Sequence, residues 1–275
     1  MSRRLRGLSI HLPNSRMTET VERRRIYTPD WTVVEESGQA LCRGPAVERM
    51  RRVLRLRPGD ALEALPGDGW LYHVRVVAFP SDQVAVLQVE TRVQPPTEPA
   101  RPVYLGVGFL KHDQLDEVLR QATELGITHF APLVTRRTVV QPKPERWDRR
   151  YRRWLRLAAE ALESSGRTRL PVIFEPMEPS EFLQKVPSDA VVLWLVEPRH
   201  ERPGPALWEY LHGHPTEPAG GWALVVGPEG GWDPEELDAV ADPRIVWVHL
   251  GPRTLRTPTG ALAALALLME RTASR

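Results

Sequence analysis

The feature that most limits the fold of this chain is the alternation of apolar and helical segments after residue 102. Short apolar runs typical of buried strands occur at 103–109, 127–134, 172–174, 191–196, 223–226 and 245–250. Helical patterns lie between them, and the two clearest are at 113–126 and 145–164. Because strands that alternate with helices form βαβ units, this part of the chain is predicted to be an α/β domain with a mostly parallel sheet.

The pattern before residue 103 is different. Over residues 26–93, short strand-like segments alternate with turn sequences such as LRPGD and PGDGW, and one helix is expected at 46–54. This spacing is typical of a small β-rich domain. Residues 94–102 are rich in proline and predict a stiff linker. Residues 1–25 are an arginine-rich extension without apolar periodicity, so the predicted order is extension, β-rich domain, linker and, from 103 to 275, α/β domain.

The composition restricts where the protein is expected to work. Of the 275 residues, 41% are hydrophobic, which is enough to bury a sizeable core. Cys42 is the only cysteine, so no disulfide can form within the chain and a reducing compartment is favoured. The longest apolar run, residues 261–269, is about half the length of a membrane-spanning helix, and the chain does not start with the apolar stretch of a signal peptide. We therefore expect a cytoplasmic protein without a membrane partner.

Positive charge is concentrated in two segments. The net charge is only +2, but residues 1–60 carry 13 arginines against 7 acidic residues, and residues 136–156 carry 9 basic residues against 2 acidic ones. Nearly all of the basic residues are arginines, whose planar guanidinium suits phosphates and base edges. Two such clusters indicate a nucleic-acid-binding protein. The alternative is a solvated, arginine-rich surface that reflects codon usage.

The sequence ALVVGPEGGWDPEEL at 223–237 combines a strand, a glycine-rich loop and the start of a helix. Ligands of open parallel sheets bind beyond the carboxyl ends of the strands, which is where this loop is expected. Its glycines, Gly227, Gly230 and Gly231, allow the backbone to approach a ligand closely or to adopt positive φ. Asp233 is the expected N-cap of the helix. The alternative interpretation is a structural turn without a ligand.

A second loop of the same kind follows the last predicted strand. Residues 246–269 contain a strand, the loop LGPRTLR and an apolar helix, for which Thr257 is the expected N-cap and Pro258 the first residue. Because this helix is apolar almost all round, we expect it to be buried in the core or in a subunit interface. Two loops at neighbouring strand ends can together enclose one ligand.

The loop at 227–231 disfavours the common nucleotide cofactors. It lacks the glycine spacing of a dinucleotide-binding loop and the Gly-Lys-Ser/Thr of a P-loop. Glu229 also places a negative charge where a phosphate would bind. A nucleoside without phosphates, or a ligand with a positive charge, therefore suits the loop better than NAD or ATP.

Four motifs occur in an order that resembles the RsmE-like family: VLRLRPGD, KHDQLDEVLRQATELGI, VVGPEGGW, and LGPRTLRT before an alanine- and leucine-rich helix. These SPOUT-superfamily enzymes methylate N3 of a uridine in small-subunit ribosomal RNA. The resemblance extends from about residue 26 to the C-terminus. It implies a PUA-like RNA-binding β-barrel at 26–93 and a SPOUT domain with a trefoil knot at 103–275. It also implies S-adenosylmethionine (SAM) as methyl donor, a homodimer, and 16S rRNA or the 30S subunit as substrate.

The resemblance also assigns candidate site residues. The SAM site is expected at Leu195, Gly227, Pro228, Glu229, Gly230, Gly231, Leu250, Gly251, Leu255, Arg256 and Thr257. Contacts to RNA are expected at Arg52, Arg55, Lys111, Arg149, Arg153 and Arg167. Arg256 and Glu229 are the catalytic candidates, and an exposed or capping role is the alternative for Glu229. The chain departs from the usual family motif Leu-Arg-Thr-Glu-Thr-Ala at Pro258 and Gly260, a change that bears on the RNA side of the site.

Several aromatic and histidine residues have a simpler interpretation. His112, His129 and His249 lack the spacing of metal ligands and are expected at the surface or in packing, so no metal site is predicted. Trp147 and Trp154 lie at helical spacing and are expected in the core rather than as platforms for bases.

Methylation at N3 of uridine sets a chemical requirement for the site. The nitrogen becomes a nucleophile only when its imide proton leaves and negative charge spreads onto the flanking carbonyl oxygens, where a cation such as Arg256 would stabilise it. The sulfonium methyl of SAM needs no metal, and alignment of the reactants supplies much of the acceleration. Two alternatives remain: a methyltransferase for another RNA nucleotide, and a non-catalytic RNA-binding protein. The second alternative gives no reason for two glycine loops.

Overall fold

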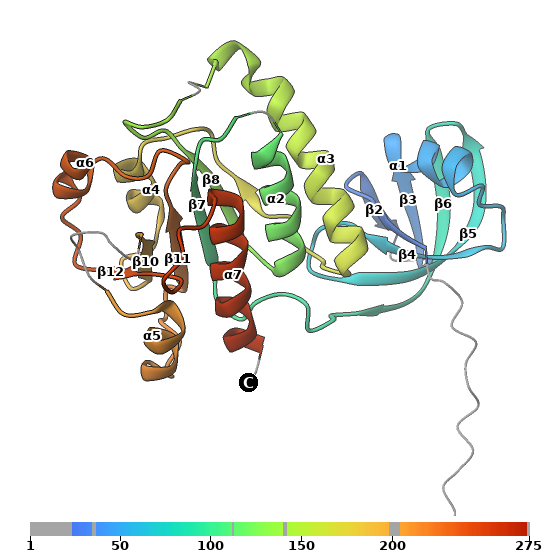
Figure 1. The fold of residues 1–275 in the computed structure, drawn as a ribbon. Coiled ribbons are helices and arrows are strands. Elements are labelled where there is room, and N and C mark those ends of the chain that lie inside the picture. The colour runs from blue at the N-terminus through green and yellow to red at the C-terminus, as the bar shows by residue number, and fades with distance from the viewer. Residues whose placement is uncertain (1–23, 35–36, 112, 140–141, 198–203, 274–275) are drawn as a thin grey trace, which may run out of the picture.

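The chain folds around two β-sheets that lie side by side and are joined by residues 94–102 (Figure 1). The computed structural model describes residues 24–34, 37–111, 113–139, 142–197 and 204–273. The first sheet comes from residues 25–93 and the second from residues 103–248. Most of the expected arginine-rich extension, residues 1–23, lies outside the described residues.

The first sheet has six strands in the order β1-β4-β5-β6-β3-β2. Its strands are β1 (Arg25–Tyr27), β2 (Trp31–Val34), β3 (Gln39–Arg43), β4 (Ala61–Leu65), β5 (Leu71–Ser81) and β6 (Val84–Val93). Neighbours are antiparallel except β1 and β4, which are parallel. The pairing of β5 with β6 shifts register between His73 and Val74 and again between Val76 and Ala78. Such bulges bend and twist the strands, and the sheet is curled around its own core.

A short helical segment closes this core. The helix α1 (Pro45–Glu48) continues directly into the π-helical turn η1 (Arg49–Val53), which confirms the helix expected at 46–54. The second half is wound more loosely, because the N–H of Leu54 donates to the carbonyl of Arg49 at 3.0 Å. Val47 and Met50 are fully buried against the curled sheet.

The second sheet is entirely parallel, as predicted, with the strand order β12-β10-β11-β7-β8-β9. Its strands are β7 (Val103–Gly108), β8 (His129–Leu133), β9 (Val172–Ile173), β10 (Val191–Leu195), β11 (Trp222–Val226) and β12 (Ile245–Val248). The order reverses between β7 and β11, which pair with each other although more than a hundred residues separate them. Crevices for ligands form at such reversal points.

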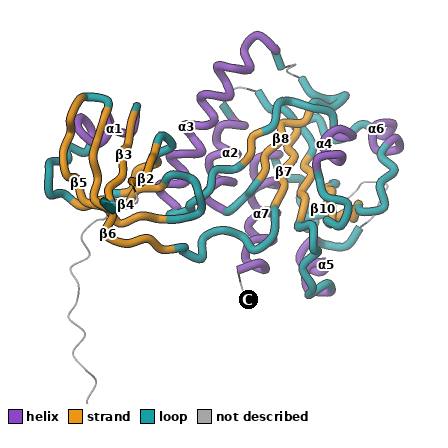
Figure 2. Tube along the Cα trace, turned by 180° about the vertical axis from the view of Figure 1, so that it is seen from behind, coloured by secondary structure: helices purple, strands orange, loops and turns teal. Residues whose placement is uncertain are grey.

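Helices cover both faces of the parallel sheet (Figure 2). The helices are α2 (Gln114–Leu125), α3 (Trp147–Ser165) with the preceding turn η2 (Pro144–Arg146), α4 (Pro179–Lys185), α5 (Leu207–Gly213), α6 (Pro234–Ala239) and α7 (Thr257–Ala273). Helices α2, α3, α5 and α7 contribute to one core cluster, and α4 and α6 contribute to the cluster on the other face. No helix in the described part of the chain is long and apolar enough to cross a membrane.

The contact between α2 and α3 follows from their apolar stripes. Leu115, Val118 and Leu119 of α2 are fully buried, and Gly126 ends the helix in the left-handed conformation, with φ of 113°. Trp154 of α3 is also fully buried, and its indole N–H donates to Asp116 of α2 at 2.5 Å. The expectation that Trp154 belongs to the core is therefore confirmed, and Trp147 is half-buried against the same cluster.

Helix α7 is buried on one side only. Ala261, Ala264 and Leu268 are fully buried against the sheet and α2. On the opposite side, Leu262 is half-buried and Leu267 keeps 43% of its surface exposed. The core therefore accounts for one face of this apolar helix, and the other face remains available for an interface.

The C-terminal half of α3 holds the two sheets together. The buried carboxylate of Glu163 accepts a hydrogen bond from the backbone N–H of Tyr27 at 2.8 Å and pairs with Arg49 at 2.6 Å. Burial raises the pKa of Glu163, although these partners oppose the shift. Leu162 packs with Leu65 and Leu71 of the curled sheet in a small cluster of their own. The two sheets therefore share a packed and hydrogen-bonded contact.

Candidate functional site

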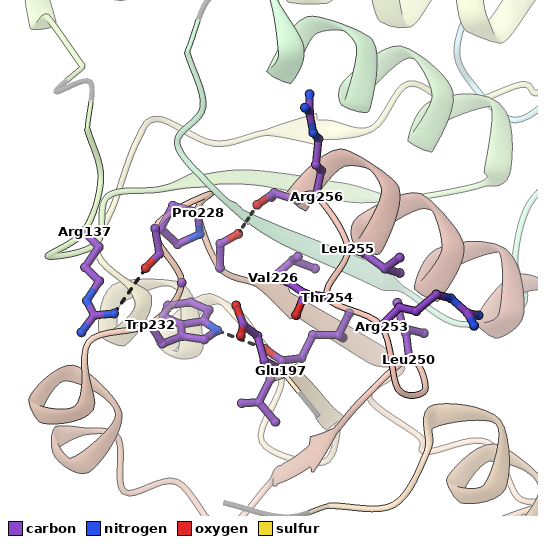
Figure 3. Close-up of a pocket in the computed structure, with 17 residues that line it drawn as sticks. Arg137, Glu197, Val226, Pro228, Trp232, Leu250, Arg253, Thr254, Leu255 and Arg256 are labelled. Atoms are coloured by element: carbon purple, nitrogen blue, oxygen red, sulfur yellow. Dashed lines mark hydrogen bonds between the residues drawn. The ribbon is translucent and has the colours of Figure 1, made fainter. Parts of the chain in front are cut away.

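Three strands of the parallel sheet, β10, β11 and β12, end side by side, and the loops that follow them line one hollow (Figure 3). We call it the loop hollow. Its lining residues are Arg137, Leu195, Val196, Glu197, Val226, Gly227, Pro228, Gly230, Gly231, Trp232, Leu250, Arg253, Thr254, Leu255, Arg256, Thr257 and Gly260. Both glycine loops singled out in the sequence therefore meet at one place. The expectation that they follow neighbouring strands is wrong, because β10 lies between β11 and β12 and its own loop contributes Glu197 to the lining.

The first glycine loop is fixed by Trp232. Its indole N–H donates to the carbonyl of Leu195 at 3.0 Å, which ties the loop after β11 to the end of β10. A Cβ at Gly227 would lie 2.9 Å from the indole nitrogen, so only glycine fits beside this ring. Gly231 has φ of +69°, a conformation that side chains other than glycine rarely adopt. Two of the three glycines are therefore required by the loop itself.

The same loop packs closely on the neighbouring strand. A Cβ at Gly108, the last residue of β7, would lie 2.3 Å from the backbone nitrogen of Pro228. Contact at this distance requires that both residues present backbone rather than side chain. The end of β7 is thereby fixed against the wall of the loop hollow.

Thr257 joins the two glycine loops. Its hydroxyl donates to the carbonyl of Gly227 at 2.8 Å, and the residue is 6% exposed. The expectation that Thr257 is the N-cap is wrong, since α7 already includes it and the N–H of Gly260 donates to the carbonyl of Arg256 at 2.8 Å. Thr257 instead uses its hydroxyl for the long-range contact. The other expected N-cap, Asp233, is confirmed, because its carboxylate accepts from the N–H of Glu235 at 3.1 Å.

Arginine and glutamate side chains lie at different places around the loop hollow. Arg137 donates to the carbonyl of Gly230 at 3.3 Å and lies 3.5 Å from the carboxylate of Asp233. Glu197, two residues after the end of β10, is the carboxylate among the lining residues. Figure 3 shows that the guanidinium of Arg256 points away from Trp232 and Glu197, and its side chain is exposed. The backbone of Arg256 therefore lines the loop hollow, while its charge projects from the rim.

Comparison with known proteins decides the family of the chain. Residues 97–269 match the model of an RNA methyltransferase domain. The chain belongs to the RsmE family of RNA methyltransferases. It is 33% identical over 80% of its length to the ribosomal RNA small subunit methyltransferase E of Synechocystis, covering 70% of that protein. It is 28% identical to the Bacillus subtilis protein of the same name, over 87% of this chain and 93% of that one.

Solved structures of the RsmE family also resemble the chain. A ribosomal RNA small subunit methyltransferase E from Neisseria gonorrhoeae, crystallised with bound SAM, superposes with a TM-score of 0.75 at 27% identity. The superposition covers 90% of this chain and 97% of that structure. Because it includes nearly the whole length of both proteins, the arrangement of curled sheet and parallel sheet is shared.

Nine of the eleven residues predicted for the SAM site of this RsmE-family chain line the loop hollow. The other two, Glu229 and Gly251, are not part of its lining, and Glu229 is exposed. A direct contact of Glu229 with a ligand in the loop hollow is therefore not supported by the geometry. Eight lining residues were not among those predicted for the SAM site: Arg137, Val196, Glu197, Val226, Trp232, Arg253, Thr254 and Gly260. Glu197 has a signal in the sequence, because it directly follows an apolar strand.

Of the predicted RNA contacts, Arg167 is contradicted by the structure. It is only 2% exposed, and its guanidinium donates to the carbonyls of Thr123 and Ile127 at 2.8 and 2.9 Å. It also pairs with Glu98 at 2.7 Å. Arg167 therefore fixes residues 94–102 to the end of α2 and cannot reach an RNA.

The other predicted RNA contacts lie at the surface: Arg52, Arg55, Lys111, Arg149 and Arg153. Arg153 is half exposed and pairs with the buried carboxylate of Asp116 at 2.6 Å, so it also has a structural role. In contrast, Arg149, Arg152 and Arg156 of α3 have no ion-pair partner within the part of the chain that the structure describes. We call these three residues the α3 stripe.

The structure describes two of the three histidines considered in the sequence, His129 and His249. The ring of His129 is stacked on Tyr104 at 4.0 Å and lies 5.8 Å from Phe174, and burial lowers its pKa. His249 accepts a hydrogen bond from the N–H of Gly251 at 3.0 Å. His112 lies outside the described residues. Among those that are described, no three His, Cys, Asp or Glu side chains are placed to hold a metal ion together.

Proposed function

We propose that this protein transfers the methyl group of SAM to N3 of a uridine in the 16S rRNA of the small ribosomal subunit. The observation that carries the proposal is the junction of two glycine loops in one hollow, tied by the contact between Thr257 and Gly227, in a chain of the RsmE family. Relatives named as small-subunit rRNA methyltransferases, and one solved with SAM, support the substrate class and the methyl donor.

The residues of the loop hollow fit SAM. Leu195, Val226 and Leu250 supply an apolar wall suited to a nucleoside base. Gly260 lines the loop hollow, and a Cβ there would meet no atom within 4 Å, so the glycine leaves open space for a ligand. Glu197 supplies a carboxylate for a ligand with positive charge. When bound, SAM supplies an electrophilic methyl group on its sulfonium.

Arg256 is suited to act on the RNA rather than on SAM. Its side chain is exposed and projects away from Trp232 and Glu197 at the rim of the loop hollow (Figure 3), so it is accessible to an approaching RNA. A guanidinium at that position stabilises the negative charge that spreads over the carbonyl oxygens of uridine when the N3 proton leaves. The proposed role of Arg256 is therefore that of a charge stabiliser, and the general base remains unassigned.

The RNA-binding surface that we propose includes the α3 stripe and the N-terminal domain. Helix α3 runs from the carboxyl edge of the parallel sheet to the curled sheet, and the α3 stripe follows part of its length (Figure 1). Arg52 and Arg55, which are both exposed, lie on the curled-sheet domain. Arg52 pairs with Glu48 on the same surface at 2.8 Å. Exposed guanidiniums on both parts suit an RNA that spans them, because phosphate contacts position the nucleic acid.

The domain organisation that we propose is a PUA-like barrel at 26–93, a linker at 94–102 and a SPOUT domain with a trefoil knot at 103–275. The superposition with the RsmE structure from Neisseria gonorrhoeae supports the two-domain arrangement, and the knot is proposed from the resemblance of the motifs to the family. The partly exposed apolar face of α7, with Leu267, and the 55% exposed Trp208 on the adjacent α5 support a homodimer. The cytoplasm, where the ribosomal subunit is made, is the proposed location.

The decisive experiment uses SAM labelled on its methyl group. The protein is incubated with 30S subunits or 16S rRNA, and the modified nucleotide is mapped by nuclease digestion and mass spectrometry. We expect N3-methyluridine at a single position. Methylation of another base or atom would favour the alternative of a different RNA methyltransferase. Tight RNA binding without any methyl transfer would favour a non-catalytic RNA-binding protein.

A further inference from the structure

A second hollow lies at the carboxyl edge of the parallel sheet, beyond β7, β8 and β9. It is lined by Phe109 after β7, by residues 142–148 at the start of α3 and by residues 175–176 after β9, and also by Arg150. The loop hollow occupies the other half of the same edge, beyond β10, β11 and β12. Because β7 and β11 are neighbours in the middle of the sheet, the two hollows serve adjacent halves of one edge.

The boundary between the two hollows is short. Gly108 packs against Pro228 of the first glycine loop, and Phe109 is the next residue along the chain. The N–H of Phe109 donates to the carbonyl of Leu133 at 2.7 Å, so its backbone is held at the end of β8. A molecule that enters the second hollow is therefore placed beside the loop that lines the proposed SAM site.

The lining of the second hollow combines aromatic rings with charges of both signs. Its rings belong to Phe109 and Trp147. The basic residues are Lys143, Arg146 and Arg150, and the acidic ones are Glu145, Asp148 and Glu175. Three carboxylates make the hollow unsuited to a bare anion such as phosphate. A nucleoside fits better, since it offers an aromatic face together with N–H and hydroxyl donors and carbonyl acceptors.

The aromatic residues of the second hollow are held in place before any ligand arrives. Trp147 is half-buried and contacts Trp154 edge to face, with ring centroids 5.5 Å apart. The guanidinium of Arg150 lies over the ring of Phe109, 5.1 Å from its centroid. A fixed ring or guanidinium plane can stack on a base at little cost in side-chain entropy. Lys143 and Arg146 at the rim are exposed.

We propose that the second hollow binds one nucleotide of the RNA substrate, close to the uridine that is methylated, by stacking on its base and by hydrogen bonds to its edge. This inference rests on the proposed function and adds a contact that positions the RNA. The α3 stripe begins at the same end of α3 and leads toward the curled sheet, so phosphates can follow the helix while this base is held. An RNA held at both places presents the target uridine to the loop hollow.

The first test changes charge at the rim without disturbing the core. The double variant Lys143→Glu with Arg146→Glu changes two exposed residues. The matched control is Lys185→Glu, because Lys185 at the end of α4 is exposed as well. We expect the KM for 16S rRNA to rise about 10-fold or more, with kcat at saturating RNA within about threefold of wild type and SAM affinity unchanged. The control is expected to stay within about twofold of wild type.

A KM within about twofold of wild type in the folded double variant would overturn the proposal. So would a fall in kcat without a change in KM, because the residues would then act on the reaction and not on RNA binding. If the wild-type protein itself transfers no methyl group, the proposed function fails, and the second test still decides whether the hollow contacts RNA.

The second test is photo-crosslinking and does not depend on catalysis. A 16S rRNA transcript that contains 4-thiouridine is bound to the wild-type protein and irradiated, and crosslinked peptides are identified by mass spectrometry. We expect crosslinks at Trp147, and we expect the Lys143→Glu with Arg146→Glu variant to reduce them several-fold relative to crosslinks on the curled-sheet domain. Crosslinks confined to other surfaces, with none at 109 or 142–150, would show that the second hollow does not hold a base.

Discussion

Replacing Thr257 by valine should weaken both the fold around the site and the binding of SAM. Valine has the same shape but no hydroxyl, so the variant loses the 2.8 Å hydrogen bond to the carbonyl of Gly227. The position is 6% exposed, so water replaces the lost donor poorly. A neutral hydrogen bond contributes about 1 kcal/mol, and leaving the partly buried carbonyl without a donor can raise the total loss to about 2 kcal/mol. We expect a loss of roughly 1–2 kcal/mol in the free energy of unfolding.

The same contact holds the two walls of the loop hollow together, so part of the loss should appear in SAM affinity. A difference of roughly 1 kcal/mol corresponds to about a fivefold rise in the Kd of SAM, to be measured by calorimetry, with urea unfolding for stability. Thr259→Val is the matched control, since Thr259 lies two residues further along α7 and is exposed. Equal stability and equal SAM affinity in Thr257→Val and Thr259→Val would refute the reasoning.

Four further predictions concern charged residues. Arg256→Ala should slow single-turnover methyl transfer about 100-fold or more and change SAM affinity little. Arg256→Lys should keep part of the activity, because lysine keeps the charge. A loss of activity that is fully explained by weaker SAM or RNA binding would refute the proposed role of Arg256. Arg149→Ala combined with Arg152→Ala should flatten the salt dependence of RNA binding by about 1–2 units in a log–log plot, and an unchanged slope would show that the α3 stripe faces away from RNA. Arg167→Ala should destabilise the protein by about 3 kcal/mol in urea unfolding, because it leaves Glu98 and two carbonyls without their partner, and a stable variant with weakened RNA binding would restore the sequence-based assignment. Burial raises the pKa of Glu163, so this carboxyl binds a proton more tightly in the folded protein than in the unfolded chain. The resulting stability is present at pH below the unfolded pKa and is lost as the pH rises through the folded pKa. The free energy of unfolding of wild type, measured relative to Glu163→Gln, should therefore fall over that window, and a difference that is constant with pH would contradict the shift.

The sequence determined the elements and the position of the site, because these depend on interactions between near neighbours. The spacing of Leu115, Val118 and Leu119 fixes the buried face of α2, and Gly126 supplies the left-handed residue that ends it. Apolar runs separated by helical patterns indicated a parallel sheet, and a parallel sheet places its loops at one edge. Two glycine loops at the carboxyl ends of successive strands were therefore enough to predict that they line one hollow, although β10 lies between their strands in the sheet. The order of four motifs indicated the family.

Only the tertiary structure decided which partners distant residues find. Thr257 looked like a helix cap, but folding brings the carbonyl of Gly227, thirty residues earlier, within reach of its hydroxyl. Arg167 looked like an RNA contact, but Glu98 and two carbonyls at the end of α2 surround it once the linker is in place. A guanidinium has the same charge on a surface and in a buried network. Whether an arginine lies on the surface or in a buried network depends on contacts between distant segments, and a local sequence pattern does not show these contacts.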